Sequence, residues 1–298
     1  MRRVRRLTDL PHRPLITAAI TPLSVDGAAL DLDAIEPYAS FLTGHGADGV
    51  FACGTTGEGV LLTLDERRAV ATAFRDTLDG ILIVHAGAQT TADTVALAEH
   101  ARDLGADAVA VIAPPYFPLD EDAVVAHFVA AARAAAPLPF WGYAFTARSG
   151  YPLTVEAIGR IRADTDNFAG LKVSESPFDR VEPYLDLGLP VLIGNEPLIA
   201  AGVARGAIGT VSGMSAAFPD VVRAGVDAAD DAAAARLTAL RTTLEASGQF
   251  IAAAKHVLGM RGIPVTTGMR APLRPLTTTE AAVLERGLAT ELPAGARR

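Results

Sequence analysis

The 298-residue sequence contains a single cysteine, Cys53, and only two lysines, Lys172 and Lys255. One cysteine excludes an intramolecular disulfide framework and a zinc site built from cysteines, and it agrees with a reducing compartment. We therefore expect a cytoplasmic protein without a cysteine-held metal. The six histidines show no two-histidine spacing typical of a metal site, so we interpret them as capping or surface residues.

Long apolar runs and basic stripes are also missing. Asp, Glu, Arg or Pro interrupts every stretch rich in Ala and Val, so none approaches the roughly 18 apolar residues that a membrane helix needs. The basic start, residues 1–6, is not followed by the apolar run of a signal peptide. The net charge of -8 is spread over interspersed acids and bases. Membranes and nucleic acids are therefore poor partners. We expect residues 1–11, which include the basic start, to form an exposed arm.

Half of the residues are hydrophobic, which is enough to bury a large core. The first 227 residues alternate short apolar runs with longer amphipathic stretches, as successive βα units do. The eight apolar runs are residues 15–21, 49–54, 81–88, 108–114, 139–145, 168–174, 190–195 and 207–212. The helix candidates between them lie near 31–46, 64–79, 91–104, 120–136, 154–164, 177–188, 197–205 and 217–227.

Eight βα units are the count of a TIM barrel, whereas a doubly wound open sheet usually stops after about five or six strands. The sequence therefore predicts an α/β fold, a (β/α)8 TIM barrel over residues 12–227. Residues 228–298 are rich in Ala and Leu, with periodic stretches near 229–247, 249–258 and 279–290. They predict a small C-terminal helical domain that packs on the barrel or on a neighbouring subunit.

Reactive side chains of a barrel lie at the carboxyl ends of its strands. The second run closes as Cys53-Gly54-Thr55-Thr56-Gly57-Glu58, a turn whose backbone N–H groups and hydroxyls suit a carboxylate or a phosphate. A tight βα turn with threonine caps explains the same residues equally well. We expect Glu58 to cap the helix that follows.

The sixth run closes with Gly170-Leu171-Lys172. Burying an ammonium group in an apolar strand is costly and favours the neutral amine, which can attack a ketone. A structural ion pair inside the barrel is the alternative interpretation of this lysine. Lys255 precedes His256 in a helical stretch, and we predict that it is a solvated surface residue.

The fifth run ends near Tyr143 and continues to Arg148. If the fifth and sixth strands are neighbours, Tyr143 and Lys172 face the same mouth of the barrel. A phenol at that position can shuttle a proton to and from a reacting oxygen. Taken singly, the tyrosine could be a packing residue and the arginine a solvated loop charge.

These motifs together, Gly54-Thr55-Thr56-Gly57-Glu58, Tyr143 and Gly170-Leu171-Lys172, resemble the dihydrodipicolinate synthase and N-acetylneuraminate lyase superfamily of pyruvate-dependent class I aldolases. The resemblance covers about residues 12–225. It implies a Schiff base between Lys172 and a 2-keto acid such as pyruvate, with acid/base chemistry by Tyr143, a proton relay through Thr55, and no metal or organic cofactor. It also implies the substrate-binding residues Thr56, Gly54, Arg148, Val211 and Tyr116.

Two departures from the family pattern concern the second substrate. Ala144-Phe145-Thr146 replaces the usual Asn-x-Pro, and Phe117 replaces a second tyrosine that relays protons in the synthases, whereas Arg148 matches the position that binds the semialdehyde carboxylate there. We therefore predict an aldolase or lyase that acts on a 2-keto acid and an aldehyde, with a 2-keto-3-deoxy sugar acid or related hydroxy keto acid as the cleaved compound. A 4-hydroxy-tetrahydrodipicolinate synthase, a dehydratase and a non-catalytic keto-acid sensor are the alternatives. The resemblance also implies a homo-oligomer, a dimer or tetramer, in which the Tyr116 loop faces a partner subunit.

Overall fold

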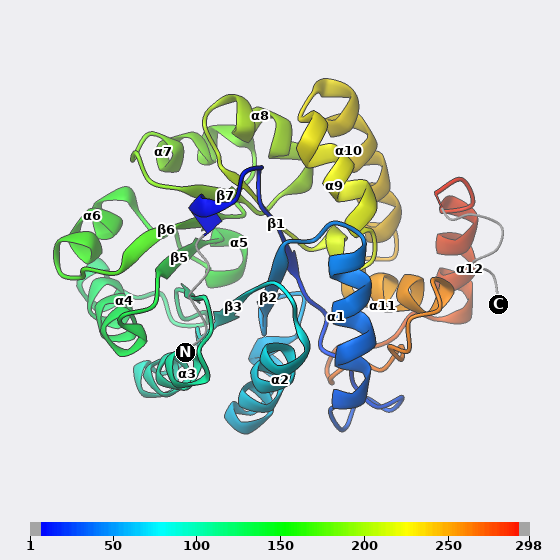
Figure 1. The fold of residues 1–298 in the computed structure, drawn as a ribbon, viewed down its shortest axis with the longest axis horizontal. Helices are drawn as coiled ribbons and strands as arrows, with labels where there is room; N and C mark the ends of the chain where they lie inside the picture. The colour runs from blue at the N-terminus through cyan, green and yellow to red at the C-terminus, as the bar shows by residue number, and fades with distance from the viewer. Residues whose placement is uncertain (1–6, 292–298) are drawn as a thin grey trace.

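The computed structural model describes residues 7–291. Eight parallel strands pair in sequence order, from β1 to β8 and back to β1, and close into a barrel with the helices outside it (Figure 1). The predicted (β/α)8 TIM barrel is therefore confirmed.

Each predicted apolar run contains one strand, and most runs extend beyond it into the loop at the mouth of the barrel. Strand residues are buried on both faces, apart from a partly exposed start of β6, which explains why the runs are apolar throughout and do not alternate. The strands are β1 Leu15–Ala18, β2 Gly49–Ala52, β3 Ile81–His85, β4 Ala108–Ile112, β5 Phe140–Ala144, β6 Phe168–Val173, β7 Val191–Ile193 and β8 Gly209–Ser212.

Side-chain caps mark the start of several barrel helices. The side chains of Thr63, Asp120 and Thr154 each accept a hydrogen bond from a backbone N–H of the first turn. The helices are α1 Ile35–Gly44, α2 Leu64–Thr77, α3 Thr91–Leu104, α4 Glu121–Ala135, α5 Thr146–Ser149, α6 Val155–Ala163, α7 Glu182–Leu185, α8 Ile199–Ala204 and α9 Pro219–Ala228. Short 3-10 segments are η1 Leu7–Asp9, η2 Leu32–Ala34, η3 Gly59–Leu61, η4 Phe178–Arg180, η5 Glu196–Leu198 and η6 Met214–Ala216.

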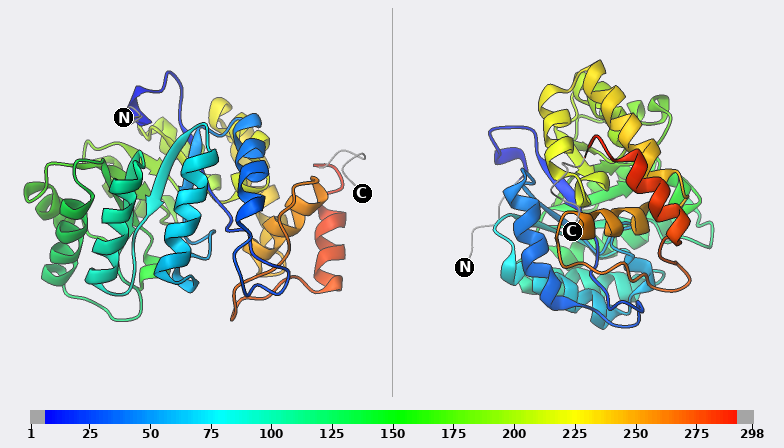
Figure 2. Two further views of the ribbon diagram at one scale, coloured as in Figure 1. Left: turned by 60° about the horizontal axis from the view of Figure 1, so that its bottom comes forward. Right: turned by 90° about the vertical axis from the view of Figure 1, so that its right-hand side faces the viewer.

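Three further helices follow the barrel: α10 Asp231–Glu245, α11 Phe250–Met260 and α12 Thr278–Gly287. The helix α10 packs on α9 and η5, while α11 and α12 lie side by side at one end of the molecule (Figure 2). The division at residues 227 and 228 into a barrel and a separate helical domain stays a prediction. Within residues 7–291, no helix combines the length and the apolar character needed to cross a membrane.

The amino-terminal arm is less exposed than predicted. Leu7 in η1 is buried in the apolar cluster that contains Ile81, Ala108 and Trp141, whereas Thr8 and Asp9 are exposed. The prediction of an exposed arm is therefore wrong at Leu7, because this aliphatic side chain covers the end of the barrel opposite the mouth. Residues 1–6 lie outside the described part of the chain.

Two histidines are buried, so the prediction of capping or surface positions is wrong for them. His85 ends β3, and His127 lies on the inner face of α4 beside Phe128. Burial lowers the pKa of His127 to about 4. Burial, and then the positive charges of Arg67 and Lys172, hold the pKa of the His85 imidazole well below its ordinary value. Both side chains are therefore neutral in the folded protein at neutral pH.

We expect the free energy of unfolding to fall as the pH drops from 6.5 to 4. The unfolded chain then takes up protons that buried His127 does not, so His127 alone removes up to about 3 kcal/mol over this range. His127→Asn keeps a polar group near the position of Nδ1, which contacts the Thr91 hydroxyl, and should flatten this pH dependence in urea titrations. Above pH 7 the free energy of unfolding should change with pH equally in the wild type and the variant. An equal change in both proteins between pH 6.5 and 4 would contradict the prediction.

Candidate active site

The side chains of Tyr143 and Lys172 lie together at the mouth of the barrel. Their strands, β5 and β6, are neighbours, and the two residues are direct register partners. Lys172 is 5% exposed, and its Nζ lies 3.9 Å from the ring centroid of Tyr143 and 4.2 Å from that of Phe51. No carboxylate of residues 7–291 pairs with this amine. The described structure therefore does not support the ion pair considered for Lys172.

A cavity of about 500 Å³ opens above the amine. This volume lies within the range of small-molecule sites. Neither Gly54 nor Tyr116 belongs to the lining residues found in the described chain: Gly54 faces the Phe51 ring, and Tyr116 is 84% exposed on the loop after β4. The other predicted site residues all line the cavity: Thr55, Thr56, Tyr143, Arg148, Lys172 and Val211.

The turn after β2 presents Thr55 and Thr56 to this cavity. The Glu58 N–H donates to the Thr55 carbonyl at 3.1 Å, and the Gly59 N–H donates to the Gly54 carbonyl at 3.1 Å. A Cβ atom at Gly59 would lie 1.9 Å from the Cys53 carbonyl oxygen, so only glycine fits there. The segment is thus a tight turn, and both of its threonines line the cavity.

Glu58 and Lys255 are not where the sequence predicted them. Glu58 makes no side-chain hydrogen bond to the helix that follows, and its carboxylate bonds instead to Lys255 Nζ at 2.6 Å. Lys255 is 0% exposed within α11. The predictions of Glu58 as a helix cap and of Lys255 as a surface residue are therefore wrong. The two residues lie 197 positions apart in the chain, and each neutralises the charge of the other inside the protein.

The loop after β5 is built as a short helix, α5, which the sequence did not predict. The buried Glu175 carboxylate accepts hydrogen bonds from the Thr146 N–H at 2.7 Å and the Thr146 hydroxyl at 2.9 Å. This carboxylate stabilises the first turn of α5, which takes the place of the family's Asn-x-Pro segment. The helix carries Arg148, whose guanidinium lies 5.7 Å from the Phe145 ring centroid. Arg148 is exposed and lines the cavity, and no carboxylate of residues 7–291 pairs with it.

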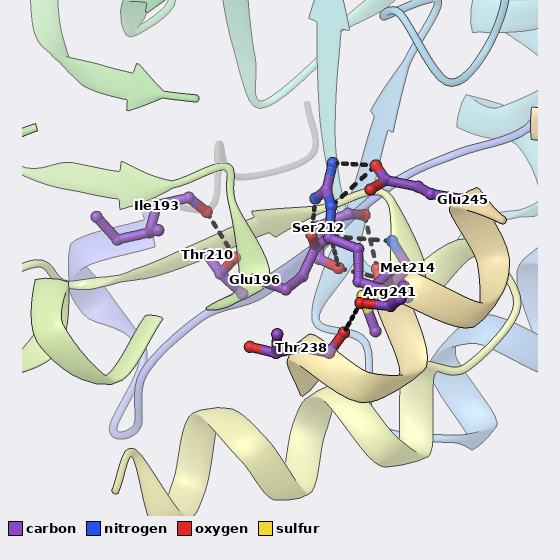
Figure 3. Close-up of polar contacts among 10 residues, drawn as sticks. Ile193, Glu196, Thr210, Ser212, Met214, Thr238, Arg241 and Glu245 are labelled. Carbon is purple, nitrogen blue, oxygen red and sulfur yellow. Dashed lines mark hydrogen bonds and ion pairs between the residues drawn. The ribbon is translucent and has the colours of Figure 1, made fainter. Parts of the chain in front are cut away.

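The opposite wall comes from segments that the sequence did not mark. Figure 3 shows Arg241 of α10 between the carboxylates of Glu196 and Glu245. Glu196 is 0% exposed and accepts hydrogen bonds from the Ser212 hydroxyl at 2.7 Å and the Met214 N–H at 3.0 Å. It also forms an ion pair with Arg241. Gln249, Phe250, Met269 and Leu273 continue this wall.

Of the residues that form this wall, only Glu196 could have been found from the sequence. Gly194 and Asn195 follow the seventh strand at the mouth of the barrel, so the adjacent Glu196 was within reach of the same argument. Arg241 and Glu245 have the spacing of an ordinary helix-surface ion pair, and nothing in their sequence points to the cavity. In the described residues, no group of three or more His, Cys, Asp or Glu side chains is arranged to hold a metal ion.

Comparisons with known proteins agree with this geometry. The model of the dihydrodipicolinate synthetase family matches residues 11–290. An uncharacterized DapA-like lyase of Halobacterium salinarum is 34% identical over 285 residues, which cover 92% of each chain. A 4-hydroxy-tetrahydrodipicolinate synthase of Bifidobacterium longum is 30% identical over 274 residues, covering 89% of this chain and 90% of the relative.

A solved structure with a similar fold is described as a putative dihydrodipicolinate synthetase from Pseudomonas aeruginosa. Its TM-score is 0.83 at 29% identity, and the match covers 93% of this chain and 98% of the other. The resemblance inferred from the three motifs is confirmed by these matches.

Proposed function

The chain belongs to the dihydrodipicolinate synthetase family and is a lyase of that family, and from this premise we propose that Lys172 forms a Schiff base with a 2-keto acid. The observation that carries the proposal is the Lys172 amine itself. It is buried beside Tyr143, lines the cavity, and pairs with no carboxylate of residues 7–291. Such an amine is placed to act as a nucleophile rather than as a structural charge.

In the proposed reaction, the neutral Lys172 amine attacks the keto carbon and forms a carbinolamine. Loss of water then gives an iminium, which withdraws electrons from the neighbouring carbon. Release of a proton from that carbon yields an enamine, which adds to an aldehyde whose oxygen takes up a proton. Water then hydrolyses the resulting iminium, which frees the product and the amine; the same steps in reverse cleave the product. Tyr143, one strand away, would give and take the proton at the carbinolamine oxygen, with Thr55 as the relay. No metal or organic cofactor enters this scheme.

We place the carboxylate of the keto acid at the Thr55–Thr56 turn. The hydroxyls of this turn line the same cavity as Lys172, and its backbone N–H groups are donors of the kind that bind anions. A carboxylate held there would leave the keto carbon directed toward the amine. Val211 would then leave room for the substrate, whereas Gly54 would leave room for the Phe51 ring that lies beside Lys172.

For the second substrate we favour a polyhydroxylated aldehyde, so that the cleaved compound is a 2-keto-3-deoxy sugar acid. The wall beyond the lysine carries small polar side chains that suit several hydroxyl groups: Ser174, Ser176, Asn195 and Gln249. A synthase that condenses pyruvate with aspartate semialdehyde is the second candidate. Arg148 supports it, because its unpaired charge suits a carboxylate on the aldehyde, and so does the Bifidobacterium longum relative.

Borohydride reduction in the presence of pyruvate, followed by peptide mass analysis, tests the chemistry. We expect a pyruvyl-sized addition on the peptide that contains Lys172, and its absence would overturn the proposal. Release of pyruvate from a panel of keto sugar acids then tests the substrate. Faster condensation with aspartate semialdehyde would favour the synthase, and loss of water without carbon–carbon cleavage would favour a dehydratase. An adduct without any turnover would favour a non-catalytic sensor.

We also propose that the chain acts as a cytoplasmic homo-oligomer, a dimer or a tetramer. Tyr116 and Phe117 are 84% and 67% exposed, and their rings pack edge to face on the loop after β4. Large aromatic side chains that are exposed together are typical of contact surfaces. Light scattering should give a mass of two or four chains, and a monomer at micromolar concentration would contradict this.

A further inference from the structure

A fully buried ion pair joins the turn after β2 to the C-terminal helices. The side chains of Glu58 and Lys255 are both 0% exposed, and Lys255 Nζ lies 2.6 Å from Glu58 Oε1 and 2.6 Å from the Gly268 carbonyl oxygen. The second carboxylate oxygen, Oε2, accepts a hydrogen bond from the Arg270 N–H at 2.7 Å. One carboxylate thus connects three segments: the turn, α11, and the chain between α11 and α12.

Stability alone is a weak explanation for this pair. Taking two charges out of water is costly, and well-packed apolar residues in the same place are often neutral or stabilising. Burial lowers the pKa of Lys255, and Glu58 counteracts this effect. The other charge nearby, the Arg270 guanidinium, pairs with Glu66 and donates to the Ala28 carbonyl. The Arg270 charge also lowers the pKa of Lys255 by repulsion, so Lys255 is the cation that pairs with Glu58 while Arg270 pairs with Glu66.

The backbone of the turn needs such an anchor. Cys53 has a φ of 59° and Glu58 a φ of 56°, so a non-glycine residue is in the left-handed region at each end of the Gly54–Gly57 segment. This conformation costs on the order of 1 to 2 kcal/mol per residue and persists where surrounding contacts hold it. At Glu58, the residue with the strained backbone is the same residue whose carboxylate is fixed by Lys255 and the Arg270 N–H.

The anchored segments border the cavity from two sides. Thr55 and Thr56 precede Glu58 by three and two residues, respectively, and Met269 lies between the two backbone groups, Gly268 and Arg270, that the pair holds. Thr55, Thr56 and Met269 all line the cavity. A displacement of the Glu58 carboxylate would therefore move the place of the keto-acid carboxylate and the opposite wall together.

We infer that Glu58 and Lys255 are positioning residues, which hold the Thr55–Thr56 turn in its ligand-binding conformation and fix the Met269 wall against it. The inference rests on the proposed function, because it assigns the turn to the keto-acid carboxylate. Neither side chain touches the substrate. Their effect should consequently appear in the affinity for the keto acid, while the reacting amine is unchanged.

The test measures borohydride trapping at Lys172 as a function of pyruvate concentration. Glu58→Gln keeps the shape of the side chain but loses its charge, and we expect the half-saturating pyruvate concentration to rise about tenfold with the same final extent of trapping. Lys255→Met leaves the Glu58 carboxylate buried without its partner and should also lower the Tm. The double variant, Glu58→Gln with Lys255→Met, should regain Tm relative to Lys255→Met but keep the raised half-saturating concentration.

A matched control is available at the other end of the barrel. Arg75 and Asp107 form a largely buried ion pair at 3.0 Å, far from the cavity-lining residues. Arg75→Met should lower the Tm and leave the half-saturating pyruvate concentration as in the wild type. A raised concentration in Arg75→Met, or a wild-type value in the folded Glu58 and Lys255 variants, would overturn the inference. Failure to trap the wild type at all would instead overturn the proposed function, and this inference with it.

Discussion

Lys172→Met is expected to abolish trapping of pyruvate and to lower kcat/KM by on the order of 10⁴-fold or more, as removal of a covalent nucleophile does in other enzymes. Methionine has a similar length and fits an apolar strand, so the barrel should fold. It lacks an amine, so neither the carbinolamine nor the iminium can form. Mass analysis after borohydride reduction and steady-state release of pyruvate measure the two effects.

The chain offers a matched control, because its only other lysine is Lys255. Lys255→Met should still be trapped on the peptide of Lys172 at high pyruvate concentration. Tyr143→Phe should also keep the adduct, but kcat should fall by about 10²-fold or more, since the phenyl ring transfers no proton. Turnover by Lys172→Met near the wild-type rate would show that the reaction does not pass through this lysine.

The placement of Tyr143 beside Lys172 could be predicted because it follows from local patterns. A strand is short and apolar, its last residues face the mouth of a barrel, and consecutive strands of this fold are neighbours. These rules are enough to bring Tyr143 and Lys172 together, and the register of β5 and β6 confirms that they are partners. The Thr55–Thr56 turn follows from the same reasoning at the end of β2.

The rest of the site depends on contacts between distant segments, which local patterns do not record. Lys255 lies in an amphipathic helical stretch, and its burial becomes visible only when Glu58, 197 residues away, is placed opposite. The helix α5 spans only residues 146–149, and Glu175 from the following βα loop stabilises its first turn. The sequence pattern around His127 predicts a helix, but it does not decide whether this side chain faces the core or the solvent. In each case the tertiary partner decides between surface and core.

Arg241→Met should destabilise the protein by about 3 to 5 kcal/mol, because it leaves the fully buried Glu196 carboxylate without its cation. The Ser212 hydroxyl and the Met214 N–H still donate to this carboxylate, but they carry no charge to balance it. For a chain of this length, the loss corresponds to a fall in Tm of roughly 5 to 8 °C. Differential scanning calorimetry at pH 7 measures it directly.

Two further variants distinguish the contribution of the buried Glu196 carboxylate from that of the partly exposed Glu245 carboxylate. Glu245→Gln removes the partly exposed partner of Arg241, which lies at 2.8 Å, and should cost less than about 1 kcal/mol because water screens that pair. Glu196→Gln combined with Arg241→Met removes both charges of the pair, including the buried one, and should recover most of the lost Tm. A Tm within one degree of the wild type for Arg241→Met would contradict the account. Since Glu196 and Arg241 both line the cavity, the same variant should also disturb the wall that faces the second substrate.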